Sequence, residues 1–374
     1  MKEKSILLGF NGYQYNITGA VADYFLKRQF KVHKLMNPLF PHHRGIRKIE
    51  SSDKSHVTTR TYNTFLSPPF SYFLDFFFPL KLPISSIMIG FNPLITLRFL
   101  LSNILRKGIV IHWNIDFSPR RFKNSFLNTI YNFLDRQCCK HSDIHVDITM
   151  QALNERYNRY KLPKHNSIII PVGVWVHSIV KCNALNWKLR ELLFIGNLSD
   201  NQGILELLSS MKLLTDKSFD FKLHIIGQGP MLEEVKQFLD LNPDLARSVL
   251  LYGELSEENF AAIAKKCCLA FALYPKIKNT FSAYSDSSKI KNYLSFGLPI
   301  IMSVIPTNSA MLESLKIARI VDVESNAIAI EVENMLTNFD LWKSYSDNAF
   351  RYIQTFDWNI QLDTLLYTIN RSKN

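Results

Sequence analysis

The stretch ELLFIGNLSDNQGILELLSSMKLL, residues 191–214, joins an apolar run, a glycine-containing loop and a segment with helical spacing of apolar residues. The run has the length of a buried strand, and residues 204–214 have the periodicity of an amphipathic helix. The pattern recurs in FKLHIIGQGP with a helix over 231–239, in SVLLYGEL with a helix over 257–266, and in the strand LAFALYP. Strands that alternate with helices predict a parallel sheet, whose ligands bind at the carboxyl ends of the strands.

The first half of the chain follows the same pattern. KSILLGF predicts a strand and 18–30 a helix, and ISSIMIGF, GIVIHW and DIHVDIT predict further buried strands. SIIIPVGVW then ends in proline and glycine, which marks a boundary. The sequence therefore predicts an α/β protein of two Rossmann-like doubly wound domains that face each other across a cleft. We expect an N-terminal domain over 1–172, a C-terminal domain over 173–355, and a helical tail over 356–374 that returns to the first domain.

The composition excludes several classes of protein. With 374 residues, 47% of them apolar and 20% charged, the chain is neither disordered, collagen-like nor a coiled coil. Its five cysteines include two adjacent pairs and no C-x-x-C spacing, which disfavours a disulfide framework or a zinc ribbon. The N-terminal apolar run predicts a strand and not a signal peptide, so we expect a cytoplasmic protein.

Charge is distributed unevenly along the chain. Residues 1–170 hold 24 Lys and Arg against 10 Asp and Glu, a net charge of +14, whereas residues 171–374 hold 20 against 22. A basic half suits a nucleic acid, an anionic membrane surface or a phosphorylated substrate, or it only keeps the protein in solution. Because no nucleic-acid recognition motif accompanies the charge, we expect no nucleic-acid partner.

An aromatic segment over 65–91 lies within this basic half. Phenylalanines crowd it and four prolines interrupt it, which excludes one long helix. Such a segment can dip into a membrane interface, or its rings can fill the core of the first domain.

YSDSSKIKNYLSFGLPII, residues 284–301, carries the clearest chemical signal. Small polar residues lead into a helix that starts near Lys289 and stops at Gly297. Amides and hydroxyls at a helix N-terminus, with a lysine in the first turn, are suited to hold phosphate. The alternative is an ordinary serine cap.

This stretch belongs to a series that resembles a known family. Together with IIIPVGV, LLFIGNLSDNQGILELLSSM, LHIIGQGPMLEEVK and VLLYGELSEEN, it is similar to nucleotide-sugar glycosyltransferases of the two-domain GT-B fold, family 4 type. GIVIHWNIDFSPRRF and LDRQCCKHSDIHVDIT look like the family's middle first-domain segments. The resemblance implies transfer of a sugar from a nucleotide diphosphate donor, bound mainly by the second domain, to an acceptor held by the first.

The resemblance also implies a retaining reaction that needs neither metal nor cofactor. Cations and backbone amides would stabilise the leaving diphosphate. In keeping with this, the chain has no strict D-x-D motif, the nearest being Asp322-Val323-Glu324. Cys138, Cys139, His141, Asp143 and His145 lie close together in the sequence, but their spacing fits zinc poorly.

The chain departs from the family at four positions. Asn197 and Gln202 stand where relatives have an arginine and a lysine, and Tyr284 and Asn292 stand where they have two glutamates. Two interpretations follow. Either Lys289, helped by Lys291, supplies the phosphate charge while Tyr284 and Asn292 contact the sugar or ribose, or the chain is a catalytically dead relative kept for binding. We favour the first, and Lys289 is the first-choice residue.

The predicted donor site draws on both domains. Gly12 and Tyr13 follow the first strand, where glycine permits close approach to phosphates, although each predicted glycine could be only a turn residue. The donor-site residues are Gly12, Tyr13, Gly196, Asn197, Gln202, Gly227, Gly253, Tyr284, Ser285, Asp286, Ser287, Ser288, Lys289 and Asn292.

The predicted acceptor site lies after the strand GIVIHW. His112 and Asp116 are catalytic candidates that could orient or deprotonate an acceptor hydroxyl, and a structural histidine is the alternative. Arg120 and Arg121 suit a phosphate-bearing acceptor, unless they are simply solvated.

These observations predict a glycosyltransferase that moves a sugar from a nucleotide-diphosphate sugar to a glycan or lipid-linked acceptor in surface polysaccharide synthesis. We expect it in the cytoplasm, peripheral at the inner face of the plasma membrane. The alternatives are a GT-B sugar-nucleotide epimerase and a non-catalytic sugar-nucleotide-binding relative.

Overall fold

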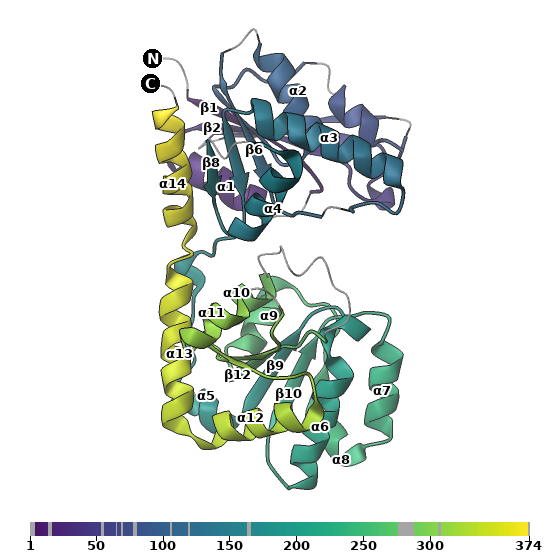
Figure 1. Cartoon of the computed structure of the whole chain (residues 1–374), viewed down its shortest axis with the longest axis vertical. Coiled ribbons are helices and arrows are strands. Elements are labelled where there is room, and N and C mark those ends of the chain that lie inside the picture. The colour runs from purple at the N-terminus through teal and green to yellow at the C-terminus, as the bar shows by residue number, and fades with distance from the viewer. Residues whose placement is uncertain are drawn as a thin grey trace. The chain divides into compact units, whose positions relative to one another are not determined.

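The computed structural model divides into two compact units (Figure 1). The first comprises Met1–Gly173 with Trp358–Asn374, and the second comprises Val174–Asp357. The structure describes residues 4–13, 17–53, 56–64, 66–68, 70–77, 81–104, 107–118, 120–162, 166–275, 288–305 and 308–372.

The first unit is built on an eight-stranded sheet in the order β4-β3-β2-β1-β5-β6-β7-β8. Neighbouring strands in the run β2-β1-β5-β6-β7-β8 are parallel. The pairs β2–β3 and β3–β4 are antiparallel. The strands are β1 (Ser5–Asn11), β2 (Lys31–Asn37), β3 (Ile46–Ser52), β4 (Val57–Asn63), β5 (Ile87–Gly90), β6 (Ile109–Asn114), β7 (Ile144–Asp147) and β8 (Ser167–Ile169).

Helices follow most parallel strands of this unit, and local signals set their ends. The Asn92 side chain accepts a hydrogen bond from the Ile95 amide at the start of α2, and Asn124 caps α3 in the same way. The last helix, α14, packs on α1, where Arg28 pairs with Asp363 at 2.7 Å. The helices are α1 (Ile17–Lys27), α2 (Pro93–Asn103), α3 (Ser125–His141), α4 (Met150–Tyr160) and α14 (Trp358–Arg371), with 3-10 turns η1 (Pro41–His43) and η2 (Tyr72–Phe76).

The second unit has a six-stranded parallel sheet in the order β11-β10-β9-β12-β13-β14. The strands are β9 (Glu191–Ile195), β10 (Lys222–Ile226), β11 (Val249–Leu251), β12 (Leu269–Ala272), β13 (Ile300–Met302) and β14 (Ala318–Ile320). The helices are α5 (Ala184–Leu189), α6 (Ile204–Asp216), α7 (Leu232–Asp240), α8 (Pro243–Ala246), α9 (Glu257–Ala264), α10 (Ser288–Leu294), α11 (Ser309–Ser314), α12 (Ser325–Thr337) and α13 (Phe339–Gln354), with 3-10 turns η3 (Val176–Ser178) and η4 (Asp200–Gln202).

The predicted α/β class with two Rossmann-like sheets is confirmed. One feature of the first sheet differs from the prediction: β3 and β4 extend it as an antiparallel hairpin. β4 is largely exposed, and neither β3 nor β4 has the continuous apolar run that marked the predicted strands. Among the described residues, no helix is both long and apolar enough to span a bilayer.

Candidate functional site

The order in which strands are added to the second sheet reverses between β9 and β12, which makes this place the switch point of the sheet. The chain leaves β9 to add β10 and β11 on one side, and it later returns to add β12, β13 and β14 on the other. In open parallel sheets, the crevice at the carboxyl ends of two such strands is the usual place for a ligand. The loop after β9 begins with Gly196, and the segment after β12 contains Tyr274.

Lys289, in the first turn of α10, extends its side chain to this crevice. Its Nζ donates a hydrogen bond to Gln202 Oε1 at 2.6 Å. The same Nζ lies 4.7 Å from the ring centroid of Phe194 and 5.2 Å from that of Tyr274. Within the described residues, no carboxylate pairs with this ammonium group. The cation is therefore held by an amide oxygen and two aromatic faces.

This setting alters the acidity of the lysine. Burial lowers the pKa of Lys289 from its ordinary value of 10.5 to about 7. The direction follows because enclosure disfavours the charged form of an amine that has no carboxylate partner in the described part of the chain. An anion bound beside Nζ would restore the charge, so the site is suited to a ligand with negative oxygens.

Two glycines bring the backbone close to this lysine. Gly196 and Gly227 have φ angles of +149° and +144°, which favour glycine. A Cβ on Gly196 would lie 2.9 Å from Lys289 Nζ, and one on Gly227 would lie 1.9 Å from the Gly196 carbonyl oxygen. Gly227 also donates a backbone hydrogen bond to Gly253 at 2.8 Å. The carboxyl ends of β9, β10 and β11 therefore meet with little side-chain bulk between them.

The structure thus brings five predicted donor-site residues together: Gly196, Gln202, Gly227, Gly253 and Lys289. Asn197 is exposed and lies against Gly229, and Ser288 and Asn292 are exposed on α10. The predicted residues Tyr284, Ser285, Asp286 and Ser287 lie outside the described residues.

A pocket of about 210 Å³ opens beside this site at the carboxyl ends of β12, β13 and β14. Tyr274 contributes to its wall and also faces Lys289, so the pocket and the lysine are neighbours. The other lining residues are Pro275, Ser303, Val304, Val321, Asp322, Val323 and Glu324.

Gly12 and Tyr13 occupy the equivalent switch point of the first sheet, where β1 lies between β2 and β5. The Gly12 amide donates to the Asn37 carbonyl at 2.9 Å, and the Tyr13 hydroxyl donates to the Ile46 carbonyl. Both residues follow β1, as predicted, and Asn37 and Ile46, which accept these hydrogen bonds, belong to the first unit.

Sequence reasoning missed a polar network at this edge. Asn11 donates to Asp75 at 2.9 Å and accepts from Asn92 at 2.7 Å, and Arg47 donates to Asp75 at 2.6 Å. Burial raises the pKa of Asp75 to about 6, although Asn11 and Arg47 oppose the shift. Asn11 and Asn92 at the ends of adjacent strands were the available signal.

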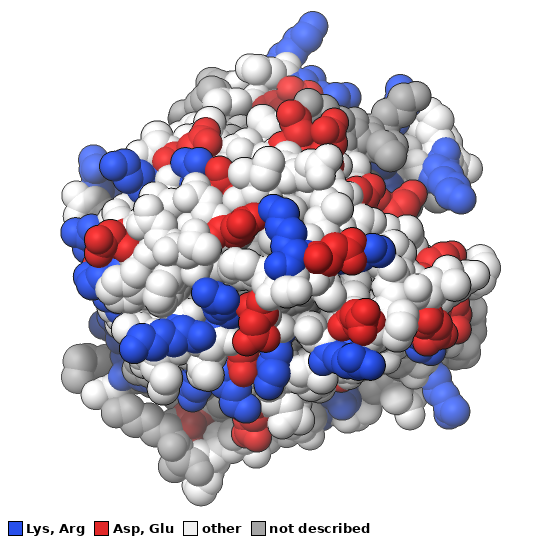
Figure 2. Space-filling view, turned by 90° about the horizontal axis from the view of Figure 1, so that it is seen from below, with Lys and Arg blue, Asp and Glu red and all other residues white. Residues whose placement is uncertain are grey.

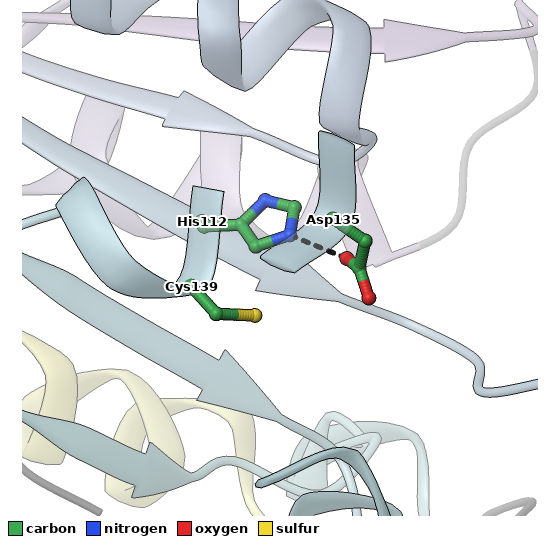
Figure 3. Close-up of side chains that lie close together, drawn as sticks. All are labelled: His112, Asp135 and Cys139. Atoms are coloured by element: carbon green, nitrogen blue, oxygen red, sulfur yellow. Dashed lines mark hydrogen bonds and ion pairs between the residues drawn. The ribbon is translucent and has the colours of Figure 1, made fainter. Parts of the chain in front are cut away.

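His112 lies on β6 and is completely buried. Its Nε2 lies 3.0 Å from Asp135 Oδ1 (Figure 3). Its Nδ1 lies 2.8 Å from Thr96 Oγ1. Because both ring nitrogens are occupied within the protein, the geometry favours the structural alternative over an acceptor base. The other acceptor candidates are more accessible: Asp116 pairs with Arg121, and Arg120 is exposed.

Asp135 belongs to a buried charge network around Arg156 of α4. Arg156 pairs with Asp135, and its Nε lies 3.2 Å from Asp147. Burial alone would raise the pKa of Asp135, but the Arg156 guanidinium and the His112 hydrogen bond outweigh it and hold that pKa well below its usual range. Tyr160 donates a further hydrogen bond to Asp135 at 2.7 Å.

His112, Asp135 and Cys139 place possible metal-ligand atoms within 4.8 Å of one another (Figure 3). The guanidinium of Arg156 already neutralises Asp135 at its other oxygen, and burial raises the pKa of the Cys139 thiol. A divalent ion here would lie beside a buried cation and would need an ionised thiol. The chemistry of these three groups therefore fits a structural network better than a metal centre.

Comparisons with known proteins agree with the two-sheet fold described above. Residues 190–338 match the family described as "Glycosyl transferases group 1". The fold is similar to that of Anabaena HepE in complex with UDP, at 12% identity and a TM-score of 0.68, covering 98% of this chain and 100% of that chain. No curated protein sequence matches the chain.

Two further solved structures share the fold. A glycosyltransferase from Rickettsia africae has 13% identity and a TM-score of 0.70, with 100% of both chains covered. Sucrose-phosphate synthase from Thermosynechococcus elongatus has 13% identity and a TM-score of 0.69, covering 99% of this chain and 100% of that chain. Most of the second unit thus matches the group 1 glycosyltransferase family, and the chain as a whole has the two-domain GT-B fold.

Proposed function

We propose that the protein transfers a sugar from a nucleotide-diphosphate sugar, with UDP-sugars as the first donor class, to a glycan or lipid-linked acceptor. The observation that carries the proposal is Lys289, a cation without a carboxylate partner among the described residues, at the switch point of a glycosyltransferase domain. Anabaena HepE, which shares the fold, was solved with UDP, and this supports uridine as the base.

The proposed role of Lys289 is to stabilise the diphosphate as it leaves. Negative charge grows on the leaving oxygens as the bond to the sugar breaks, and a fixed cation stabilises that charge most in a site that excludes water. Gly196 and Gly227 leave room for the phosphates to approach the backbone. Gln202, which stands where relatives have a cation, holds Lys289 in position through its amide oxygen.

We propose further that the reaction is retaining and needs no metal, which rests on the family resemblance. The proposed pathway is surface polysaccharide synthesis, with the protein in the cytoplasm and peripheral at the inner face of the plasma membrane. The net charge of +14 on residues 1–170 supports an anionic surface or a lipid diphosphate acceptor.

Donor affinity is expected to fall as pH rises. The free enzyme has a Lys289 pKa of about 7, and a bound diphosphate raises it, so the charged lysine that the donor requires becomes scarce above pH 7. Between the free and bound pKa values, the Kd for a UDP-sugar should rise by about tenfold for each pH unit. Calorimetric titration from pH 6 to 9 measures this. Lys289→Arg, which stays charged, should give a nearly flat profile; a slope that survives in that variant would assign the pH effect to another group.

Nucleotide release tests the function itself. A transferase releases UDP only when a suitable acceptor is present, apart from slow hydrolysis. An epimerase would change the donor sugar without any acceptor, and a binding relative would hold the donor and leave it intact. Assays with a panel of nucleotide sugars, with and without a lipid extract, therefore separate the three functions.

A further inference from the structure

Aromatic and aliphatic side chains are exposed on neighbouring elements of the first unit. In α3, Phe126, Ile130 and Phe133 are 70%, 42% and 57% exposed. In and beside η2, Phe70, Phe73 and Phe77 are 75%, 54% and 53% exposed. α2 packs against both α3 and η2, so both elements are neighbours of the same helix. We call these six side chains the aromatic face.

The pattern in α3 is the reverse of that in an ordinary surface helix. Its buried side carries Asp135 and Cys138, whereas its exposed side carries Phe126, Ile130 and Phe133. Spacings of four and three residues put these three side chains on one stripe of the helix. A surface helix normally presents polar residues to water, and a cluster of exposed apolar side chains marks an interaction site.

The charge around the aromatic face identifies what could cover it. Residues 66–142 contain nine Lys and Arg and three Asp and Glu. All three acidic side chains are engaged in ion pairs: Asp75 with Arg47, Asp116 with Arg121, and Asp135 with Arg156. On and beside α3, the exposed cations are Lys123, Arg136 and Lys140. By contrast, the face in Figure 2 shows both signs of charge interspersed.

A second copy of the chain would bring a basic region against an equally basic one, which is unfavourable. An anionic bilayer fits both the exposed apolar side chains and the excess of basic residues. Rings insert at the headgroup boundary, and lysines and arginines contact the acidic headgroups. We propose that the aromatic face docks the first unit on the surface of an anionic bilayer. The contact is at the membrane surface and uses only residues of the first unit. A test of this docking is therefore independent of a test of the donor site.

Co-sedimentation of the full chain with vesicles tests the proposal. Wild type should bind vesicles of phosphatidylglycerol and phosphatidylcholine in equal parts, bind pure phosphatidylcholine weakly, and release as salt rises. The triple variant Phe126→Ser, Ile130→Ser and Phe133→Ser should lose about tenfold or more of the partition coefficient. A matched control, Leu241→Ser with Ile330→Ser, removes exposed apolar side chains of the second unit and should bind like wild type.

UDP-sugar binding should be the same in all these variants, which separates lost docking from lost folding. A second variant, Lys123→Glu with Lys140→Glu, tests the charge without changing the rings and should also weaken binding. Two results would overturn the proposal: wild type that ignores the anionic vesicles at low salt, or a triple variant that binds as well as wild type. A wild type that is dimeric where the triple variant is monomeric, without vesicle binding, would assign the face to a second copy.

Discussion

Replacing Lys289 with alanine is expected to lower kcat/KM by about 100-fold or more, the effect of removing one fixed group that stabilises developing negative charge. The fold should survive, because Lys289 makes no ion pair with a described carboxylate and its neighbours include the rings of Phe194 and Tyr274. Steady-state kinetics with a saturating acceptor measures the loss.

Two variants make this result specific. Lys212→Ala removes a partly exposed lysine of α6 that pairs with Asp216, and its kinetics should match wild type. Lys289→Arg keeps the charge with a different shape, so it should retain more activity than alanine. If Lys289→Ala turned over like wild type, the diphosphate would be stabilised elsewhere and the proposed role of this lysine would be wrong.

Replacing Arg156 with alanine is expected to destabilise the first unit by about 3–5 kcal/mol, because it leaves Asp135 and Asp147 buried without their cation. Arg156 is 1% exposed, so water cannot readily replace it. Hydrogen exchange on the intact protein measures the effect. Amides of β6 and β7 should exchange faster, whereas those of β9 and β10 in the second unit should not change.

The control for this variant is on the same helix. Arg159 pairs with Glu155 on the surface of α4 and is 42% exposed at its side chain, so Arg159→Ala should change stability by less than about 0.5 kcal/mol. Equal protection in the Arg156 and Arg159 variants would show that the buried network contributes little to the first unit.

The fold could be predicted because its signals are local. Most parallel strands are short apolar runs, and most helices have their own period, so the alternation is visible without tertiary contacts. The parallel strand β2, KVHKLMN, has no such run and was not predicted. The exposed strand β4 has no such run, and the β3–β4 hairpin was therefore missed. Local capping is visible in the same way: at the start of α9, Ser256 precedes two glutamates, and its side chain accepts a hydrogen bond from the Asn259 amide.

The site was predictable only in part. Lys289 stood out because a lysine is unusual in the first turn of a helix. Its contact with Gln202, 87 residues away, depends on the order of strands in the sheet, which spacing does not reveal. His112 follows the expected pattern of a strand end, yet Asp135 and Thr96 enclose it, and the sequence shows no sign of that enclosure.

The aromatic segment shows the same limit. Composition left open whether its rings were buried or exposed, and the structure gives both: Phe91 is buried while Phe70, Phe73 and Phe77 are exposed. The exposed stripe of α3 was missed because its spacing is also that of a helix whose apolar side faces a core.

The central claim is that Lys289 serves sugar transfer from a nucleotide diphosphate. Mass spectrometry of the products tests it most directly, with wild type and Lys289→Ala each incubated with UDP-sugars and a lipid acceptor extract. The account predicts free UDP and an acceptor heavier by one sugar residue from wild type, and almost none of either from Lys289→Ala. Equal product from both proteins, or a donor that stays bound and intact with every acceptor, would contradict it.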